Sequence, residues 1–178
     1  METFTPMVLV LASGRGERFR ASGGQGSKLQ ALLAGRPVLE RTLDAVRASG
    51  LPWHLEQGGH AGMGDSIAAA VRATRQAAGW LVLPGDLPLV QAGTLQAVAQ
   101  ALARHLTVVP VCQRQRGHPV GFAAALGDEL ASLCGPTGAA RVLRAHPPHE
   151  LALDDAGCIT DIDTLQDLVL AQQRLGGA

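Results

Sequence analysis

Apolar positions along the chain fall into short continuous runs that alternate with stretches of helical periodicity. Two runs, 7–12 and 80–83, are apolar at every position, which is typical of strands buried on both faces of a parallel sheet. Weaker patterns predict further strands at 53–57, 107–111, 120–124 and 150–153. Helical spacing predicts helices at 38–49, 67–74, 94–106, 128–133, 138–145 and 163–175. Because strands alternate with helices, we predict a three-layer α/β domain with a mostly parallel sheet.

Length and composition favour a single folded domain over residues 1–178. The chain shows no internal repeat and no change of composition that would mark a second domain. Hydrophobic residues make up 47% of it and the formal net charge is zero, which excludes disorder of the bulk. The chain has no excess of basic residues and no Tyr, and aromatic residues make up only 3% of it. This composition argues against a nucleic-acid partner.

Neither a membrane nor a secretory location is indicated. The first seven residues lack the basic and apolar regions of a signal peptide. The longest apolar runs are far shorter than the ~20 residues that a membrane span needs. The three cysteines are far apart and form no metal or disulfide pattern, so we predict a cytoplasmic protein with reduced thiols.

A glycine-rich loop follows the first predicted strand. Residues 13–27 include five glycines, whose backbone N–H groups can approach an anion without side-chain obstruction. Arg18 adds positive charge, as does Lys28, which is the only lysine among 15 basic residues. The loop therefore suits phosphate, although it matches neither the Walker pattern nor the dinucleotide fingerprint, and a tight turn is the alternative.

Two acidic positions are candidates for metal binding. Asp86 directly follows the apolar strand at 80–83, where a carboxylate can hold Mg²⁺ against phosphate oxygens, or can simply stabilise a turn. Asp161 and Asp163 form a second group just before the last predicted helix. Asp163 could cap that helix, and the capping and metal roles are compatible.

Two more polar segments adjoin predicted elements. Residues 62–66, Gly-Met-Gly-Asp-Ser, begin a helix whose free N–H groups favour an anion or a polar base, unless Asp65 or Ser66 caps it. Residues 116–119, Arg-Gly-His-Pro, are compact and polar, and a β-turn is the alternative to a binding role.

These segments together resemble the molybdenum cofactor cytidylyltransferases, within the Rossmann-like nucleotidyltransferases. The resemblance rests on five motifs in one order, from about Met7 to Leu168. They are Leu-Ala-Ser-Gly-x-Gly-x-Arg-Phe followed by Lys28, Gly-Met-Gly-Asp-Ser, Pro-Gly-Asp-Leu-Pro, Arg-Gly-His-Pro-Val-Gly-Phe and Asp-Ile-Asp-Thr.

The resemblance implies a role for each motif. Lys28, Arg18 and Asp86 would be catalytic, and Asp86 with Asp163 or Asp161 would coordinate Mg²⁺. Acceptor contacts would come from Arg116, Gly117, His118 and Pro119. The nucleotide would be bound by Leu11, Ala12, Ser13, Gly14, Gly16, Lys28, Gly64 and Ser66.

The implied reaction moves CMP from CTP to the phosphate of molybdopterin and releases pyrophosphate. Ser13, where guanylyl-transferring relatives have Gly and cytidylyl-transferring relatives have Ala, favours CTP together with the Arg-Gly-His-Pro-Val segment. A molybdoenzyme or its chaperone is the implied protein partner. The alternatives are another phosphorylated acceptor, such as a sugar phosphate, and a non-catalytic accessory role in which the protein only binds a nucleotide or cofactor.

Three departures from the family pattern bear on these expectations. The stretch between Ser49 and Gly62 is short, so the sheet could lack an edge strand and base recognition could differ. Pro136 stands where the family has an acidic residue, and the loop before Lys28 is long.

Overall fold

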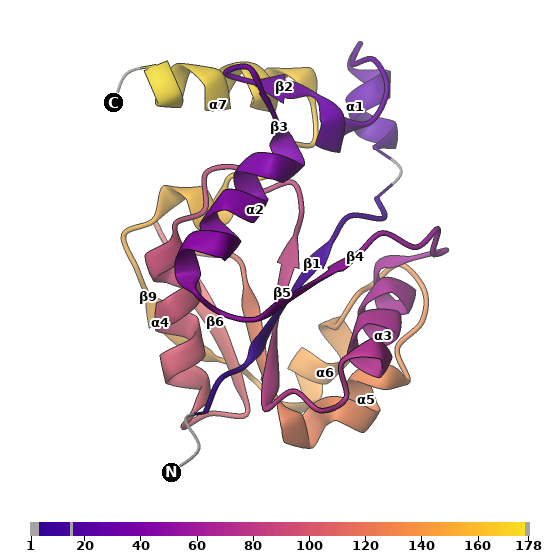
Figure 1. The fold of residues 1–178 in the computed structure, drawn as a ribbon, viewed down its shortest axis with the longest axis vertical. Helices are drawn as coiled ribbons and strands as arrows, with labels where there is room; N and C mark the ends of the chain where they lie inside the picture. Colours follow the sequence, from indigo (N-terminus) through magenta and orange to yellow (C-terminus); the bar gives the residue numbers. More distant parts are fainter. Residues whose placement is uncertain (1–3, 15, 177–178) are drawn as a thin grey trace.

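A computed structural model describes residues 4–14 and 16–176, built around a seven-stranded sheet (Figure 1). The remaining residues of the predicted 1–178 domain lie outside the described part. The strand order is β4-β1-β5-β8-β6-β7, with β9 paired to β6. The strands of this sheet are β1 (Met7–Leu11), β4 (Trp53–Glu56), β5 (Gly79–Pro84), β6 (Thr107–Cys112), β7 (Gln115–Arg116), β8 (Val120–Ala123) and β9 (His149–Ala152).

Five of these strands run in one direction. β1 pairs in parallel with both β4 and β5, and β6 pairs in parallel with β9. β8 runs the opposite way between β5 and β6, and β7 is antiparallel to β6. The mostly parallel α/β sheet is thus confirmed, and the carboxyl ends of β4, β1 and β5 lie side by side at one edge.

Helices cover both faces of the sheet, as Figure 1 shows. Alternate residues of β1 point to opposite layers: Val8 and Val10 belong to the core beneath one pair of helices, whereas Leu9 and Leu11 belong to the core on the other face. The first pair is α2 (Val38–Ser49) and α4 (Ala92–Leu102). The opposite face is covered by α3 (Met63–Ala73), α5 (Gly127–Ala131) and α6 (Ala140–Ala145).

A small assembly lies over the carboxyl edge of the sheet. It consists of α1 (Glu17–Ala21), the hairpin β2 (Leu32–Leu33) and β3 (Arg36–Pro37), and α7 (Leu165–Gly176) (Figure 1). The backbone N–H of Ala34 donates to Gln172 Oε1 at 2.6 Å, and that of Leu165 donates to Ser22 Oγ at 2.9 Å. These bonds join the assembly across more than 130 residues of sequence.

The periodicity missed two parts of this assembly. The predicted loop 13–27 contains α1, a helix too short to show a repeating pattern. The hairpin turns at Ala34 and Gly35, whose φ angles of 49° and 77° are both left-handed, as in a two-residue hairpin turn. Its strands have two residues each, too few for alternation to appear.

The short segment 50–62 still supplies a strand. β4 forms the edge of the sheet beside β1, in register from Val8↔Trp53 to Leu11↔Glu56. Short 3-10 helices complete the chain: η1 (Lys28–Gln30), η2 (Ala124–Leu126) and η3 (Ala156–Ile159).

Two sequence expectations concern the rest of the chain. Cys112 and Cys158 are buried and Cys134 is exposed, and all three are free thiols. None of the helices within the described residues has the length and apolar character required to cross a membrane.

Candidate active site

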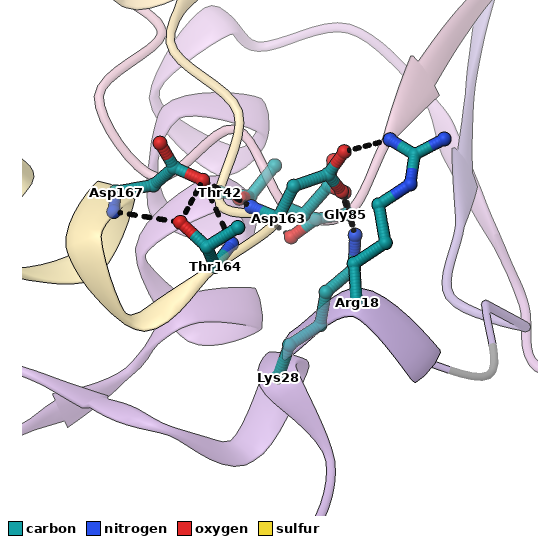
Figure 2. A network of polar contacts seen from close by, with 8 residues as sticks. Arg18, Lys28, Thr42, Gly85, Asp163, Thr164 and Asp167 are labelled. Carbon is teal, nitrogen blue, oxygen red and sulfur yellow. Dashed lines mark hydrogen bonds and ion pairs between the residues drawn. The ribbon is translucent and has the colours of Figure 1, made fainter. Parts of the chain in front are cut away.

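The two loops singled out in the sequence leave the same edge of the sheet. Leu11 and Pro84 are register partners at the ends of β1 and β5. Beyond them, the N–H of Gly85 donates to the carbonyl of Leu11 at 2.8 Å, which continues the ladder into the turn. Thr42 Oγ1, buried on α2, donates to the carbonyl of Gly85 at 2.8 Å and fixes this turn from beneath (Figure 2). Asp86 is therefore held directly beside the start of the glycine-rich loop.

Lys28 connects two carboxylates from distant parts of the chain. Its Nζ lies 2.6 Å from Asp86 Oδ2 and 2.7 Å from Asp163 Oδ1, with its side chain only 12% exposed (Figure 2). Burial on its own would lower the pKa of Lys28, but the charges and hydrogen bonds of Asp86 and Asp163 outweigh it and raise the pKa. The side chain is thus an ammonium group fixed between two acids.

Asp161 joins this group to form a cluster of three carboxylates. Oxygens of Asp86, Asp161 and Asp163 all lie within 4.8 Å of one another. The N–H of Ile162 donates to the carbonyl of Asp86 at 2.9 Å, so the backbone itself brings 161–163 to the turn after β5.

Asp163 and Asp161 differ in how readily they ionise. Burial would raise the pKa of Asp163, but the hydrogen bond and charge of Lys28, together with Arg18, lower it below its ordinary value. Burial raises the pKa of Asp161, and the negative charges of Asp86 and Asp163 add to the effect. A cation placed among them would relieve this repulsion.

The cluster fits a hard divalent cation. Mg²⁺ and its relatives prefer one or two carboxylates together with phosphate and water oxygens. Asp86 Oδ1 is buried and has no hydrogen-bond partner, a costly state that a ligand at this point would remove. The expectation that Asp86, Asp163 and Asp161 could hold a metal together is therefore consistent with the geometry.

The expected capping role of Asp163 is wrong. α7 begins at Leu165, and its cap is Thr164, whose Oγ1 accepts from the N–H of Asp167 at 3.2 Å. In return, Asp167 Oδ2 accepts from the N–H of Thr164 at 2.7 Å (Figure 2). This reciprocal capping box leaves the Asp163 side chain available to Lys28 and Arg18.

Arg18 approaches the cluster from the solvent side. Its Nη1 donates to Asp163 Oδ2 at 2.6 Å, but its side chain is 80% exposed (Figure 2). An exposed pair of this kind contributes little to stability. Arg18 is thus an exposed cation beside a largely buried one, Lys28.

A cavity of about 220 Å³ opens next to Lys28, between the glycine-rich loop and the start of α3. Of the predicted nucleotide-binding residues, the cavity is lined by Leu11, Ser13, Gly14, Lys28 and Ser66. The hydroxyls of Ser13 and Ser66 lie 2.6 Å apart and join the two walls.

Three predicted nucleotide-binding residues lie outside this lining. Gly16, with a φ of 61°, lines an adjoining hollow together with Arg18 and Lys28. The N–H of Ala12 donates to the carbonyl of Glu56 at 2.9 Å, so Ala12 extends the sheet. Gly64 packs against the backbone at 134–135, where an added Cβ would lie 2.8 Å from the carbonyl oxygen of Cys134.

The start of α3 is not capped by Asp65 or Ser66. The N-cap residue is Gly62, which has no side chain to accept from the free N–H groups of the helix. Asp65 instead accepts from the N–H of Gly135 at 3.0 Å, and Gly64 donates to the carbonyl of Gly135 at 2.8 Å. The loop that contains Pro136 therefore supports the glycine-rich start of α3.

A second cavity, of about 460 Å³, lies on the other side of Lys28 and Asp86. Its lining includes the predicted acceptor residues Arg116, Gly117 and His118, but not Pro119, which is buried beside them. Arg116 forms an exposed ion pair with Glu150. The structure thus gathers both acidic groups and most of the acceptor motif around one space.

His118 is a half-buried residue that lines this cavity. Burial lowers its pKa, although the negative charge of Asp86 and the backbone of Val82 oppose the effect. Its Nδ1 is buried and has no partner. Gly117 is required for close packing, since a Cβ there would lie 2.4 Å from the carbonyl oxygen of Cys158.

Sequence reasoning missed several lining residues. Leu29, His60 and Met63 line the first cavity, and Gln115, Cys158 and Ile159 line the second. The only signal for His60 was its place in the glycine cluster at 58–64. Met63 lies within the segment 62–66, whereas nothing in the sequence pattern marked the other four.

Comparison with known proteins places this geometry in a family. Residues 44–151 match the MobA-like NTP transferase domain. The bifunctional protein GlmU of Dichelobacter nodosus is 24% identical over 151 residues, which cover 71% of this chain and 31% of that protein. The chain thus spans about a third of the length of this curated relative.

Solved structures share the fold over nearly the whole chain. Rv0371c of Mycobacterium tuberculosis H37Rv has a TM-score of 0.80 and 24% identity, covering 97% of this chain and 100% of its own. A second structure of Rv0371c, in complex with manganese, has a TM-score of 0.76 and 24% identity, over 96% and 100% of the two chains. Molybdopterin-guanine dinucleotide biosynthesis protein A of Archaeoglobus fulgidus has a TM-score of 0.71 and 18% identity, over 97% and 100%.

The family match spans more than half of the chain, from α2 to β9. The motif-based resemblance is confirmed at the level of this family of nucleotidyltransferases. The protein belongs to the MobA-like NTP transferase family of nucleotidyltransferases, with an α/β Rossmann-like fold.

Proposed function

We propose that this protein transfers CMP from CTP to the phosphate of molybdopterin, with Mg²⁺ as its cofactor and pyrophosphate as the second product. The observation that supports this most directly is the position of Lys28. Its ammonium lies between Asp86 and Asp163 and lines both cavities, so it can contact a triphosphate in one and an acceptor in the other.

The chemistry needs positioning and charge neutralisation more than covalent help. An oxygen of the acceptor phosphate attacks the α-phosphorus of CTP, and the bond from that phosphorus to the bridging oxygen of pyrophosphate breaks. The acceptor phosphate is already ionised at neutral pH, so no general base is required. Lys28 neutralises charge on the triphosphate, and Arg18 adds a second cation from α1.

Asp86 would hold Mg²⁺ with Asp163 and Asp161. When bound, the metal supplies neutralisation of the charge that spreads over the phosphate oxygens. Asp86 also keeps Lys28 in place through the 2.6 Å contact, so one carboxylate positions both cations.

The base and acceptor assignments rest on side chains of the two cavities. Ser13, fixed to Ser66 in the first cavity, favours CTP, whereas Arg116 and His118 line the space for the acceptor. We place the reaction in the cytoplasm, with a molybdoenzyme or its chaperone as the recipient of the product.

Pyrophosphate release tests the proposal. The protein is incubated with molybdopterin or a sugar phosphate as acceptor and with CTP, GTP or ATP, with and without Mg²⁺, and melting temperatures are measured for the same mixtures. We expect release that needs Mg²⁺ and is fastest with CTP, together with stabilisation by CTP plus Mg²⁺. Release with sugar phosphates but not with molybdopterin would overturn the acceptor, and no stabilisation by any triphosphate would overturn the transferase assignment.

A further inference from the structure

Three polar side chains gather at the carboxyl end of β4, away from the acidic cluster. Glu56 Oε1 accepts from the N–H of Gly58 at 2.9 Å and lies 3.0 Å from His60 Nε2. The other oxygen, Oε2, lies 3.4 Å from His54 Nε2. Glu56 is only 13% exposed, so the carboxylate is fixed in a largely dry position between two histidines.

The contacts of Glu56 determine which atom of His60 remains available. Burial would raise the pKa of Glu56, but the hydrogen bonds from His60, the Gly58 backbone and His54 lower it, so the group is an ionised carboxylate. An ionised carboxylate can only accept hydrogen bonds, so His60 Nε2 carries the hydrogen that faces it. In the neutral imidazole, Nδ1 is then a hydrogen-bond acceptor.

The backbone further fixes His60. Its own N–H donates to the carbonyl of Gly58 at 2.9 Å, which closes a tight turn around Glu56. An imidazole held at Nε2 and at its main chain loses little further freedom when it binds a ligand.

His60 lines the first cavity, and His54 does not. The sheet order places β1 between β4 and β5, so His60 and Asp86 lie on opposite sides of the end of β1. When Lys28 binds the triphosphate beside Asp86, the nucleoside of the same nucleotide therefore lies toward His60. Between the two ends, the lining contains the hydroxyls of Ser13 and Ser66 and the apolar side chain of Leu29.

We infer that His60 is a base-recognition residue, whose ring acceptor takes a hydrogen bond from an amino group of the nucleobase, with Glu56 as its positioning residue. The inference rests on the proposed function, because it needs a nucleotide in the first cavity. It names the substrate class more closely: a base with an amino group, as in cytosine, is favoured over uracil, which has a carbonyl oxygen at the same position.

Equilibrium binding of CTP and UTP, each with Mg²⁺ at pH 8, tests the inference on the full chain. Wild type is compared with His60→Phe, which keeps a ring and loses the acceptor, and with His60→Gln, which restores an acceptor. His54→Phe is the matched control, since His54 also contacts Glu56 but is absent from the cavity lining. Melting temperatures of all variants show whether each is folded.

We expect wild type to bind CTP about tenfold more tightly than UTP, the scale of one hydrogen bond. His60→Phe should weaken CTP about tenfold, leave UTP within twofold and so abolish the preference, while His60→Gln recovers part of it. His54→Phe should keep the wild-type ratio. Equal loss of CTP and UTP affinity in His60→Phe, or a wild-type preference for UTP, would overturn the inference.

Glu56→Gln tests the positioning role separately, in steady-state pyrophosphate release. A positioning role predicts a rise in KM for CTP, an unchanged kcat and a reduced ratio of CTP to UTP affinity. An unchanged ratio would overturn that role. Failure of the proposed function gives a different result: wild type would bind CTP and distinguish it from UTP, yet release no pyrophosphate.

Discussion

The two cavities beside Lys28 differ in how their polar groups are satisfied. In the first, the polar side chains are paired with one another: Ser13 with Ser66 at 2.6 Å and His60 with Glu56 at 3.0 Å. Two buried atoms have no partner: His118 Nδ1, whose residue lines the second cavity, and Asp86 Oδ1, whose residue lines both. No other buried side-chain polar atom in the described part of the chain is in that state.

The difference indicates a division of labour. A cavity whose polar groups are already fixed by one another is pre-organised and suits recognition of shape and hydrogen-bond pattern. A cavity lined by buried polar atoms that lack hydrogen-bond partners suits a charged ligand. Lys28 and Asp86 line both, so the reacting atoms belong at this boundary.

The largest expected effect on activity is at Asp86, which lies where the two cavities meet. Asp86→Asn removes the charge that holds Lys28 and takes part in the acidic cluster, so we expect pyrophosphate release to fall about 10³-fold. Asp44→Asn is the control, because Asp44 is an exposed partner of Arg36 on α2 and should leave the rate within twofold. A rate for Asp86→Asn within tenfold of wild type would show that the boundary is not the reaction centre.

Lys28→Arg should have the next largest effect, a loss of about 10²-fold in kcat. A planar guanidinium cannot take the place of a compact ammonium between two oxygens at 2.6 and 2.7 Å in a site that is 12% exposed. Arg18→Lys makes the reverse exchange at an 80% exposed position and should cost only a few-fold. Equal losses in the two variants would contradict a role specific to lysine.

A pair of glycines compares the packing of the two cavities. In Gly117→Ala the new Cβ would meet the Cys158 carbonyl at 2.4 Å, so we expect a loss of about 1–3 kcal/mol and a melting temperature lower by roughly 3–10 °C. In Gly14→Ala nothing lies within 4 Å of the added Cβ, and the melting temperature should change by less than about 1 °C. Calorimetry of both variants checks this, and similar shifts would show that the loop at 117 can yield.

The smallest effect concerns Glu56 and depends on pH. Its pKa is lowered in the folded protein, so its stabilisation is complete above the ordinary value of 4.5 and is lost as the pH falls through the lower folded value. Glu56→Gln should therefore lose about 1–2 kcal/mol at pH 7, and the difference from wild type should shrink below about pH 4. Urea unfolding at several pH values measures it.

Glu40→Gln serves as the control for that series, because Glu40 forms an exposed pair with Arg47. Its effect should stay within a few tenths of a kcal/mol at every pH. A Glu56→Gln difference that grew as the pH fell below about pH 4 would contradict the lowered pKa.

Local patterns predicted the elements well where the elements are long. The fully apolar runs at 7–12 and 80–83 became β1 and β5, and the helix predicted at 38–49 has these bounds in the structure. The patterns failed for α1 and the β2–β3 hairpin, whose two to five residues are too few for a periodic pattern to show.

The sequence likewise indicated the candidate residues more readily than the residues that each of them contacts. The structure places Asp163 in the cluster of three carboxylates, but not at the cap that the sequence left open, because Thr164 and Asp167 cap α7 together. Spacing alone cannot distinguish neighbouring polar residues that compete for the same helix end.

The sequence by itself determined the alternation of strands and helices and the order of the polar motifs, because both depend on side chains within a few residues of one another. Only the tertiary structure decided that Lys28 pairs with Asp86, 58 residues away, and with Asp163, 135 residues away. It also decided that Glu56 holds His60 at the first cavity, and that Asp86 Oδ1 and His118 Nδ1 are buried without a hydrogen-bond partner. These contacts depend on strand order and on which loops leave the same edge of the sheet, and neither property is contained in any local window of the chain.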